Sequence, residues 1–475
     1  MRFLSRFLLI VLVVALVGLA GAWLWAGRMD GPTVEIRSPQ KFVGGSTALE
    51  MMVEAPDGQF SAVEATLEQG GMTYRIYPRD EGEGAGATQG SAEQLWISRP
   101  LGKKTIPELK SGPARLTVRA ARPVVYGLRD AETVVTRDLQ VRLEPPTVAV
   151  LSTFHYINLG GSEFVVYRVT PDDVVSGVRV GEKEYIGYPA AGAGIDSDPA
   201  LRVAFFALLF DQPVNTPIQV FARDEAGNQA VTPLDHMVFN KAYQQSRIEV
   251  DDRFLQRVVP AIAANVPDAN IPTDDVLAGF LKINGELRSS NNQYLRELAK
   301  KSVPELMFMD AFQQLGNSQV EARFADTRTY IYKGKPIDKQ VHLGFDLAVT
   351  ANVPLVAAHR GVVVHASDLG IYGNCVVIDH GMGVQSLYGH LSSIGVKVGD
   401  RVEKGQEIGR SGMTGLAGGD HLHFTMLVGG EQVTPVDWWS AQWMQDRVRR
   451  KIAAAGGPGA AASPGAAGGA AGQEP

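Results

Sequence analysis

Short runs of alternating hydrophobic and polar residues make up most of this chain. From about residue 32 to 243, such runs are broken by Gly, Pro, Asp and Asn, the pattern of strands joined by turns. Between 244 and 320 the apolar residues recur at helical spacing instead. Strand-like text, dense in glycine, returns at 321–445. The pattern predicts a mainly β protein with a helical connector at 244–320.

The first apolar run, residues 7–27, has about the length that an α-helix needs to cross a bilayer. Arg2 and Arg6 precede it, which favours a cytoplasmic N-terminus. The small residues at 20–22 resemble the cleavage site of a signal peptide, but the apolar run continues through two tryptophans. We therefore expect residues 1–30 to be an uncleaved single-pass anchor in the cytoplasmic membrane. The bulk of the chain would lie on the periplasmic side.

A faint internal repeat divides the first β region. "PTVEI" at 32–36 returns as "PTVAV" at 146–150, and "GGS" at 44–46 returns at 160–162. The spacing predicts two tandem β-sandwich domains, 31–144 and 145–243, which resemble bacterial immunoglobulin-like modules. Ligand binding and a spacer role both fit such domains, and the spacer is favoured.

Three helices are expected in the connector, at 251–266, 273–302 and 303–317, the second beginning near Thr273. The last segment, 446–475, is rich in Ala, Gly and Pro and is expected to be disordered. A folded domain at 321–445 lies between these segments.

Composition narrows the function classes. The net charge of −6 over 475 residues argues against nucleic-acid binding. The single cysteine, Cys375, excludes an intramolecular disulfide and a cysteine-based zinc cluster. Seven of the nine histidines fall between His342 and His423, so their spacing decides what they do.

The stretch "VHLGFDLAV" at 341–349 alternates in a way that would place His342 and Asp346 on one face of a strand. Gly344, between them, would leave space above the backbone. A metal site and a polar solvent-facing strand are equally good interpretations of this motif alone.

The stretch "HLHF" places His421 and His423 two residues apart, again on one strand face. One of the two can complete a His–Asp–His metal site with a fourth position open to water, the pattern of catalytic zinc. The other would face that water. His390, in "YGHLS", is a second imidazole that fits a site moving protons.

These motifs, in this order, resemble those of the lysostaphin/LytM-type zinc endopeptidases. The resemblance extends over about residues 324–442 and includes "YGNCVVIDHG", "VGDRVEKGQEIGRSGMTG" and "PVDWW". It implies a small antiparallel β domain with a groove across the sheet. It also implies one zinc ion and a substrate among the peptide stems and cross-links of peptidoglycan.

The resemblance assigns roles residue by residue. His342, Asp346 and His423 match the zinc ligands, while His421 and His390 match the catalytic histidines, with their two roles undivided. Three residues before His342 match the region where family members contact substrate: Arg328, Tyr330 and Tyr332. Asp420 and Thr425 depart from the family pattern, and three histidines match no ligand position: His359, His365 and His380.

Two other functions are weighed against this one. A non-catalytic relative that activates a cell-wall amidase would lack zinc ligands, which are all present here. "VGDRVEKGQEIG" also resembles hairpins of biotinyl and lipoyl carriers, but the setting of a modifiable lysine is missing. A further hypothesis is that the connector or the sandwich domains cover the groove and keep the enzyme latent.

Overall fold

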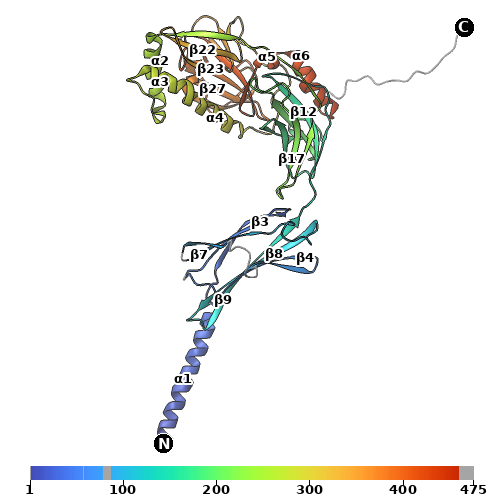
Figure 1. Ribbon diagram of the computed structural model, residues 1–475, viewed down its shortest axis with the longest axis vertical. Coiled ribbons are helices and arrows are strands. Elements are labelled where there is room, and N and C mark those ends of the chain that lie inside the picture. Colours follow the sequence, from blue (N-terminus) through green and yellow to red (C-terminus); the bar gives the residue numbers. More distant parts are fainter. Residues whose placement is uncertain (1, 57, 79–86, 92, 459–475) are drawn as a thin grey trace, which may run out of the picture. The chain divides into compact units, whose positions relative to one another are not determined.

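The computed structural model describes residues 2–56, 58–78, 87–91 and 93–458 of the chain (Figure 1). Its contacts divide the chain into two compact units. The first comprises 1–146 with 223–229, and the second comprises 147–222 with 230–475. Most of the predicted disordered tail, from 459 onwards, lies outside the described residues.

The first unit begins with the expected apolar helix, α1 (Arg2–Ala26). Its segment Arg6–Ala26 has a mean hydropathy of 2.8 and is long enough to cross a membrane. Almost all of the described side chains of this helix are exposed, and only its last residue, Ala26, is buried by the rest of the unit. A helix of this kind fits both a membrane anchor and a signal sequence.

Two sheets that enclose one hydrophobic core follow the helix in the first unit. The first sheet has the order β1-β3-β7-β6: Thr33–Ser38, Ala48–Glu54, Gln94–Pro100 and Ala87–Ser91. The second has the order β2-β9-β8-β4-β5: Phe42–Val43, Arg129–Val141, Gly112–Val124, Ala62–Gln69 and Met72–Tyr77. Inward-facing residues such as Leu49, Leu67 and Leu116 are fully buried between them.

The second unit also begins with two four-stranded sheets. One has the order β10-β12-β16-β15: Thr147–Val150, Ser162–Thr170, Leu201–Ala207 and Tyr188–Pro189. The other has the order β14-β13-β17-β18: Lys183–Ile186, Val175–Val180, Ile218–Arg223 and Gln229–Pro233. A parallel pair, β11 (His155–Asn158) and β19 (His236–Phe239), lies beside them. The sequence repeat corresponds to β1 and β10, each the edge strand of its sheet.

Two of the three predicted helices are present: α2 (Asp252–Asn265), and α3 (Val276–Lys282) continuing through a π-helical turn into α4 (Arg288–Ala299). Asp275 caps α3, close to the expected start. The prediction of a third helix at 303–317 is wrong. Its backbone N–H groups bond outward instead, Met307 to the His380 carbonyl and Phe312 to the Trp438 carbonyl. The apolar residues at helical spacing belong to an irregular segment, and their side chains are buried in the core.

The C-terminal domain is built around an eight-stranded sheet. Its main path runs β21-β24-β32-β28-β27-β26-β30: Gln319–Ala322, Phe345–Ala348, Leu422–Val428, Val384–Leu391, Asn374–Asp379, Gly361–Asp368 and Arg401–Val402. The eighth strand, β33 (Glu431–Val433), pairs with β32. Two three-stranded sheets flank it: β20 (Gln245–Val250), β22 (Asp326–Tyr332) and β23 (Lys335–His342); and β25 (Pro354–Val356), β31 (Glu407–Arg410) and β29 (Ser393–Ile394). β27 and β28 form an antiparallel hairpin at 374–391.

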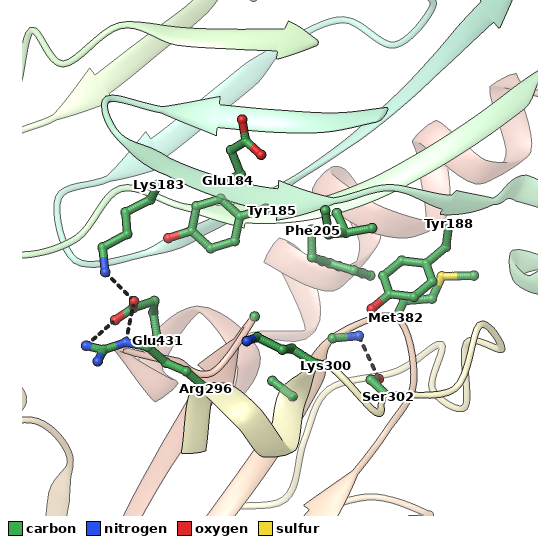
Figure 2. Close-up of a pocket in the computed structure, with 14 residues that line it drawn as sticks. Lys183, Glu184, Tyr185, Tyr188, Phe205, Arg296, Lys300, Ser302, Met382 and Glu431 are labelled. Atoms are coloured by element: carbon green, nitrogen blue, oxygen red, sulfur yellow. Dashed lines mark hydrogen bonds and ion pairs between the residues drawn. The ribbon is translucent and has the colours of Figure 1, made fainter. Parts of the chain in front are cut away.

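One hydrophobic core joins the second pair of sheets to the C-terminal domain. Phe205 of β16 packs against Phe308 and Trp438, each with ring centroids 5.7 Å away. At the edge of this contact, Lys183 and Arg296 both bind Glu431, at 2.6 and 2.9 Å (Figure 2). A cavity of about 500 Å³ lies beside this ion cluster. The second β-sandwich is thus fixed to the C-terminal domain by shared packing.

The end of the described chain corrects one boundary of the sequence analysis. Residues 446–454, expected in the disordered tail, are helical: a π-helical segment (Met444–Arg449) continues into α7 (Arg450–Ala454). Val448 and Ile452 are fully buried in the shared core. This packing stabilises the helical segment, although the amino-acid composition of the tail suggests disorder.

Candidate active site

The register of the central sheet brings the candidate ligands together. β24 pairs antiparallel with β32 so that Asp346 lies directly opposite His423. On the other side of β32, Gly389 of β28 lies opposite His423. His342 ends β23 in the neighbouring sheet, opposite Asp326. Three separate strands therefore supply the site.

Three ligand-type atoms converge at this point. His342 Nε2 lies 2.9 Å from Asp346 Oδ1 and 3.0 Å from His423 Nδ1, and His423 Nδ1 lies 3.0 Å from Asp346 Oδ1. All three residues are buried. This is the only group of three or more potential ligands that meets the geometric requirement for a metal among the described residues.

The predicted local structure around His342 and Asp346 is wrong in two respects. His342 and Asp346 do not share a strand, because the chain leaves one sheet after His342 and enters another at Phe345. Gly344, between the two strands, does not leave empty space either. A Cβ there would lie 2.5 Å from the Cε1 and Nε2 atoms of His423, so the glycine makes room for that imidazole ring.

The donor set fits a zinc ion. His342 Nδ1 lies 3.1 Å from the Arg323 carbonyl, to which only a protonated nitrogen can donate, so Nε2 presents a lone pair to the site. That lone pair faces a carboxylate oxygen and a second imidazole nitrogen, an arrangement that a bound cation stabilises. Tetrahedral zinc with bonds of about 2.0–2.1 Å would separate its ligand atoms by about 3.3 Å, close to the spacing found.

Two further imidazoles border these atoms. His421 Nε2 is 3.4 Å from Asp346 Oδ1, and its Nδ1 lies 2.9 Å from the Gly419 carbonyl. His390 Nδ1 lies 2.8 Å from the Thr414 carbonyl, and its ring centroid is 4.9 Å from that of His421. His390 has a φ of +66°, a left-handed conformation that is uncommon outside glycine and concentrates at functional sites.

The electrostatic environment sets the protonation of these groups. Burial opposes ionisation of Asp346, but the attraction of His342 and hydrogen bonds with the surrounding histidines hold the pKa of its carboxyl well below the usual range. Burial lowers the pKa of His423 to about 4 and, together with His421 and His423, holds the pKa of His390 well below its ordinary value. His423 and His390 are therefore neutral near pH 7, and neutral imidazole is the form that binds metals.

Two of the three expected substrate-contact residues line the same cavity. Arg328 Nη2 binds Asp346 Oδ2 at 3.0 Å, leaving Oδ1 for the histidines. Tyr330 packs against Phe280 of α3 and is largely buried. Tyr332 is placed elsewhere, with its hydroxyl 2.5 Å from Asp252 Oδ1.

Asp420, the local departure from the family pattern, anchors a loop. Its carboxylate accepts hydrogen bonds from Ser411 Oγ at 2.6 Å and from the Asn352 backbone N–H at 3.1 Å. The three other histidines of the 342–423 region have structural partners outside the cavity: Asp310 for His359, Tyr294 for His365 and Ser386 for His380.

The cavity at the histidines is small, about 110 Å³. Sites for small organic ligands usually measure about 300–1,000 Å³. Several of its walls were not identified from the sequence: Arg288 of α4, Ile371, Tyr372 and residues 416–418. Tyr372 begins the motif "YGNC", which offered a signal, whereas nothing in the connector sequence marked Arg288 as a neighbour of the histidines.

Comparison with known proteins identifies the family of this domain. Residues 340–435 match the model of peptidase family M23, a range that holds all five polar site residues. The chain is 43% identical over 100 residues to the peptidoglycan DD-endopeptidase ShyA of Vibrio cholerae, covering 21% of this chain and 23% of ShyA. It is 39% identical over 97 residues to the DD-carboxypeptidase/endopeptidase Mpg of Neisseria meningitidis, covering 20% and 22%.

The catalytic domain of lysostaphin from Staphylococcus simulans, a solved structure, is 29% identical, with a TM-score of 0.23 and coverage of 27% of this chain and 98% of that domain. The chain spans less than a quarter of the length of ShyA and Mpg, so these likenesses concern one domain. By its motifs, its sheet and its family match, the C-terminal domain of this chain is an M23 peptidase domain of the lysostaphin/LytM type.

Proposed function

We propose that this chain is a zinc-dependent endopeptidase that hydrolyses peptide cross-links or stem peptides of peptidoglycan. The observation that carries the proposal is the convergence of His342, Asp346 and His423 within about 3 Å of one another, inside the M23 domain. The names of ShyA and Mpg support the substrate class.

In this proposal His342, Asp346 and His423 hold one zinc ion, which supplies Lewis acidity that makes water nucleophilic near neutral pH. The remaining chemistry belongs to His421 and His390. Because each directs Nδ1 at a backbone carbonyl, Nε2 is the atom that can take a proton and return it to the leaving amine. Arg328 positions Asp346 by binding its second oxygen, and with Tyr330 it lines the path to the site.

In the same proposal, helix α1 attaches the protein to the membrane and the two pairs of sheets act as a spacer. Helix α1 is an uncleaved anchor in the cytoplasmic membrane, since Arg2 and Arg6 precede its apolar run and that run continues through Trp23 and Trp25. The rest of the chain then lies in the periplasm. The two pairs of sheets are immunoglobulin-like modules that hold the peptidase domain away from the membrane.

Digestion of purified sacculi tests the proposed function. The full-length protein, loaded with one equivalent of zinc, should release new stem-peptide amines that mass spectrometry of the products detects. A folded, zinc-loaded protein that releases none, both unmodified and with Arg257→Ala in the contact that closes the site, would contradict the proposal. The alternative, a non-catalytic activator of a cell-wall amidase, predicts no stoichiometric zinc and product release only when an amidase is added to the same assay.

We further propose that the helical segment keeps the site closed until it is displaced. Arg257 of α2 donates a hydrogen bond of 2.7 Å to the Ala417 carbonyl, and Leu416 packs on the core formed by the helices. Both loop residues line the cavity, as does Arg288 of α4. The helices thus hold one wall of a cavity that is too small for a cross-linked peptide.

Arg257→Ala is expected to raise the rate of sacculus hydrolysis about 10-fold. A hydrogen bond from a charged donor contributes about 1.5 kcal/mol, which corresponds to a factor of about ten in the population of the open site. Arg253→Ala, an exposed position on the same helix, is the matched control and should leave the rate unchanged. Equal rates for both variants and the unmodified protein would mean that the hydrogen bond between Arg257 and Ala417 does not keep the site closed. A point change suits this test because deleting the upstream region would uncover the shared core around Phe308.

A further inference from the structure

The hairpin between β8 and β9 ends in an apolar tip of four residues, 125–128, with the sequence Val-Tyr-Gly-Leu. Tyr126 is fully exposed and Leu128 is 42% exposed. Val125 and Tyr126 have φ values of +50° and +56°. Hairpin turns with this backbone favour Asn and Gly, and a β-branched residue there is strained. The tip therefore keeps exposed apolar side chains at a conformational cost, which points to a use for them.

The hairpin runs alongside the end of helix α1. Arg122 Nε donates to the Asp30 carbonyl at 2.9 Å, Ala131 is buried in one cluster with Ala26, and the Arg129 guanidinium lies 4.6 Å from the centre of the Trp23 ring. Positions nearer the tip thus contact positions further back in the helix. A hairpin that continues in this direction places its tip, residues 125–128, level with Trp23 or nearer the start of α1. Figure 1 shows β9 meeting α1.

That level of the helix has the side chains of a membrane–water interface. Trp23 is 50% exposed and Trp25 is 61% exposed, and tryptophan and tyrosine are enriched where lipid headgroups begin. Arg129, stacked on Trp23, places a cation at the height where lipid phosphates lie. Tyr126 combines an apolar ring with a polar hydroxyl, which suits the same depth.

We infer that the β8–β9 tip inserts into the interface of the bilayer that α1 crosses, as a second membrane contact of the first unit. The inference rests on the proposed role of α1 as a membrane helix. Its partner is the boundary between the headgroups and acyl chains of phospholipids, with Tyr126 and Leu128 in the apolar zone and Arg129 at the phosphates. Two contacts, a helix and a hairpin beside it, restrict the tilt of the attached sheets relative to the membrane.

Site-specific fluorescence tests the inference. The only native cysteine, Cys375, is buried, so a cysteine introduced at Tyr126 can be labelled selectively with an environment-sensitive dye. The matched control is Met72→Cys, a half-exposed methionine at the start of β5, at the other end of the same sheet. Each variant is made as the full chain by cell-free synthesis and reconstituted in vesicles of phosphatidylethanolamine and phosphatidylglycerol. Intact mass confirms that α1 is retained.

The Tyr126→Cys label should emit at shorter wavelength than the Met72→Cys label, and nitroxides on the lipids should quench it at least 3-fold more strongly. A second variant, Leu128→Asp, should reduce that quenching by half or more. Equal emission and quenching at both positions would overturn the inference, because the helix is present in every sample. Loss of α1 from the protein made in cells would instead contradict the proposed anchor, which separates the two failures.

Discussion

Replacing His423 with alanine is expected to remove the bound zinc and the peptidase activity together, whereas His421→Ala should remove the activity and leave the zinc in place. His423 Nδ1 lies 3.0 Å from both His342 Nε2 and Asp346 Oδ1, so its loss leaves a two-ligand site. His421 is 3.4 Å from Asp346 and belongs to no triad of ligand atoms. Loss of a proton-transferring side chain typically lowers a rate by about 10²–10⁴-fold.

Elemental analysis of the purified variants and sacculus hydrolysis by the same samples measure the two effects. His236→Ala, in a strand of the second β-sandwich, is the control for a histidine remote from the site and should keep both zinc and activity. Circular dichroism verifies that each variant is folded. Loss of zinc from both His421→Ala and His423→Ala would contradict the assignment of zinc binding to His423 and proton transfer to His421.

The five polar residues of this site were identifiable from the sequence because each stands in a short motif whose order along the chain is specific. The sequence could not reveal how they meet. Asp346 and His423 are 77 residues apart and face each other only through the register of β24 and β32. The need for a glycine at position 344 was predicted, but for the wrong reason. The space beside Gly344 is filled by the His423 ring, which comes from a different strand.

The elements that were predicted wrongly share one physical cause. Residues 303–317 have apolar residues at helical spacing, yet Phe308 and Phe312 are buried in an aromatic cluster with Trp438 and their segment bonds to other parts of the chain. Residues 446–454 precede an Ala/Gly-rich tail but are helical because Val448 and Ile452 enter the shared core. In both segments tertiary burial outweighs the local pattern, and a local pattern contains no information about distant partners.

The buried ion pair between Glu163 and Lys451 should make the second unit sensitive to the loss of either partner. Lys451 Nζ lies 2.8 Å from Glu163 Oε1 and donates to the Phe164 carbonyl at 2.7 Å. Glu163 is completely buried and also accepts backbone hydrogen bonds from Tyr156 and Phe164. Burial raises the pKa of Glu163 and lowers the pKa of Lys451, so each group depends on the other to remain charged.

Lys451→Met is expected to lower the free energy of unfolding by about 3 kcal/mol. It leaves the buried Glu163 carboxylate with only the more distant Arg447, whose Nε lies 3.8 Å from Oε2, as a counter-charge. Denaturant unfolding followed by tryptophan fluorescence measures this change. Arg449→Met, an exposed position in the same helical segment, should shift the free energy by no more than about 0.5 kcal/mol. The double change Glu163→Gln with Lys451→Met should recover part of the loss, since no isolated charge remains.

The same experiment tests how the second β-sandwich is joined to the peptidase domain. Glu163 lies on β12 of the sandwich and Lys451 on α7, which follows the peptidase domain in the chain. If the two regions unfold as one body, Lys451→Met shifts a single transition observed by all probes. A separate early transition of the sandwich, with the peptidase transition unchanged, would show that their shared core around Phe205 and Trp438 does not couple them. A single shifted transition would mean that the sandwich and the strands that position His423 unfold as one cooperative unit.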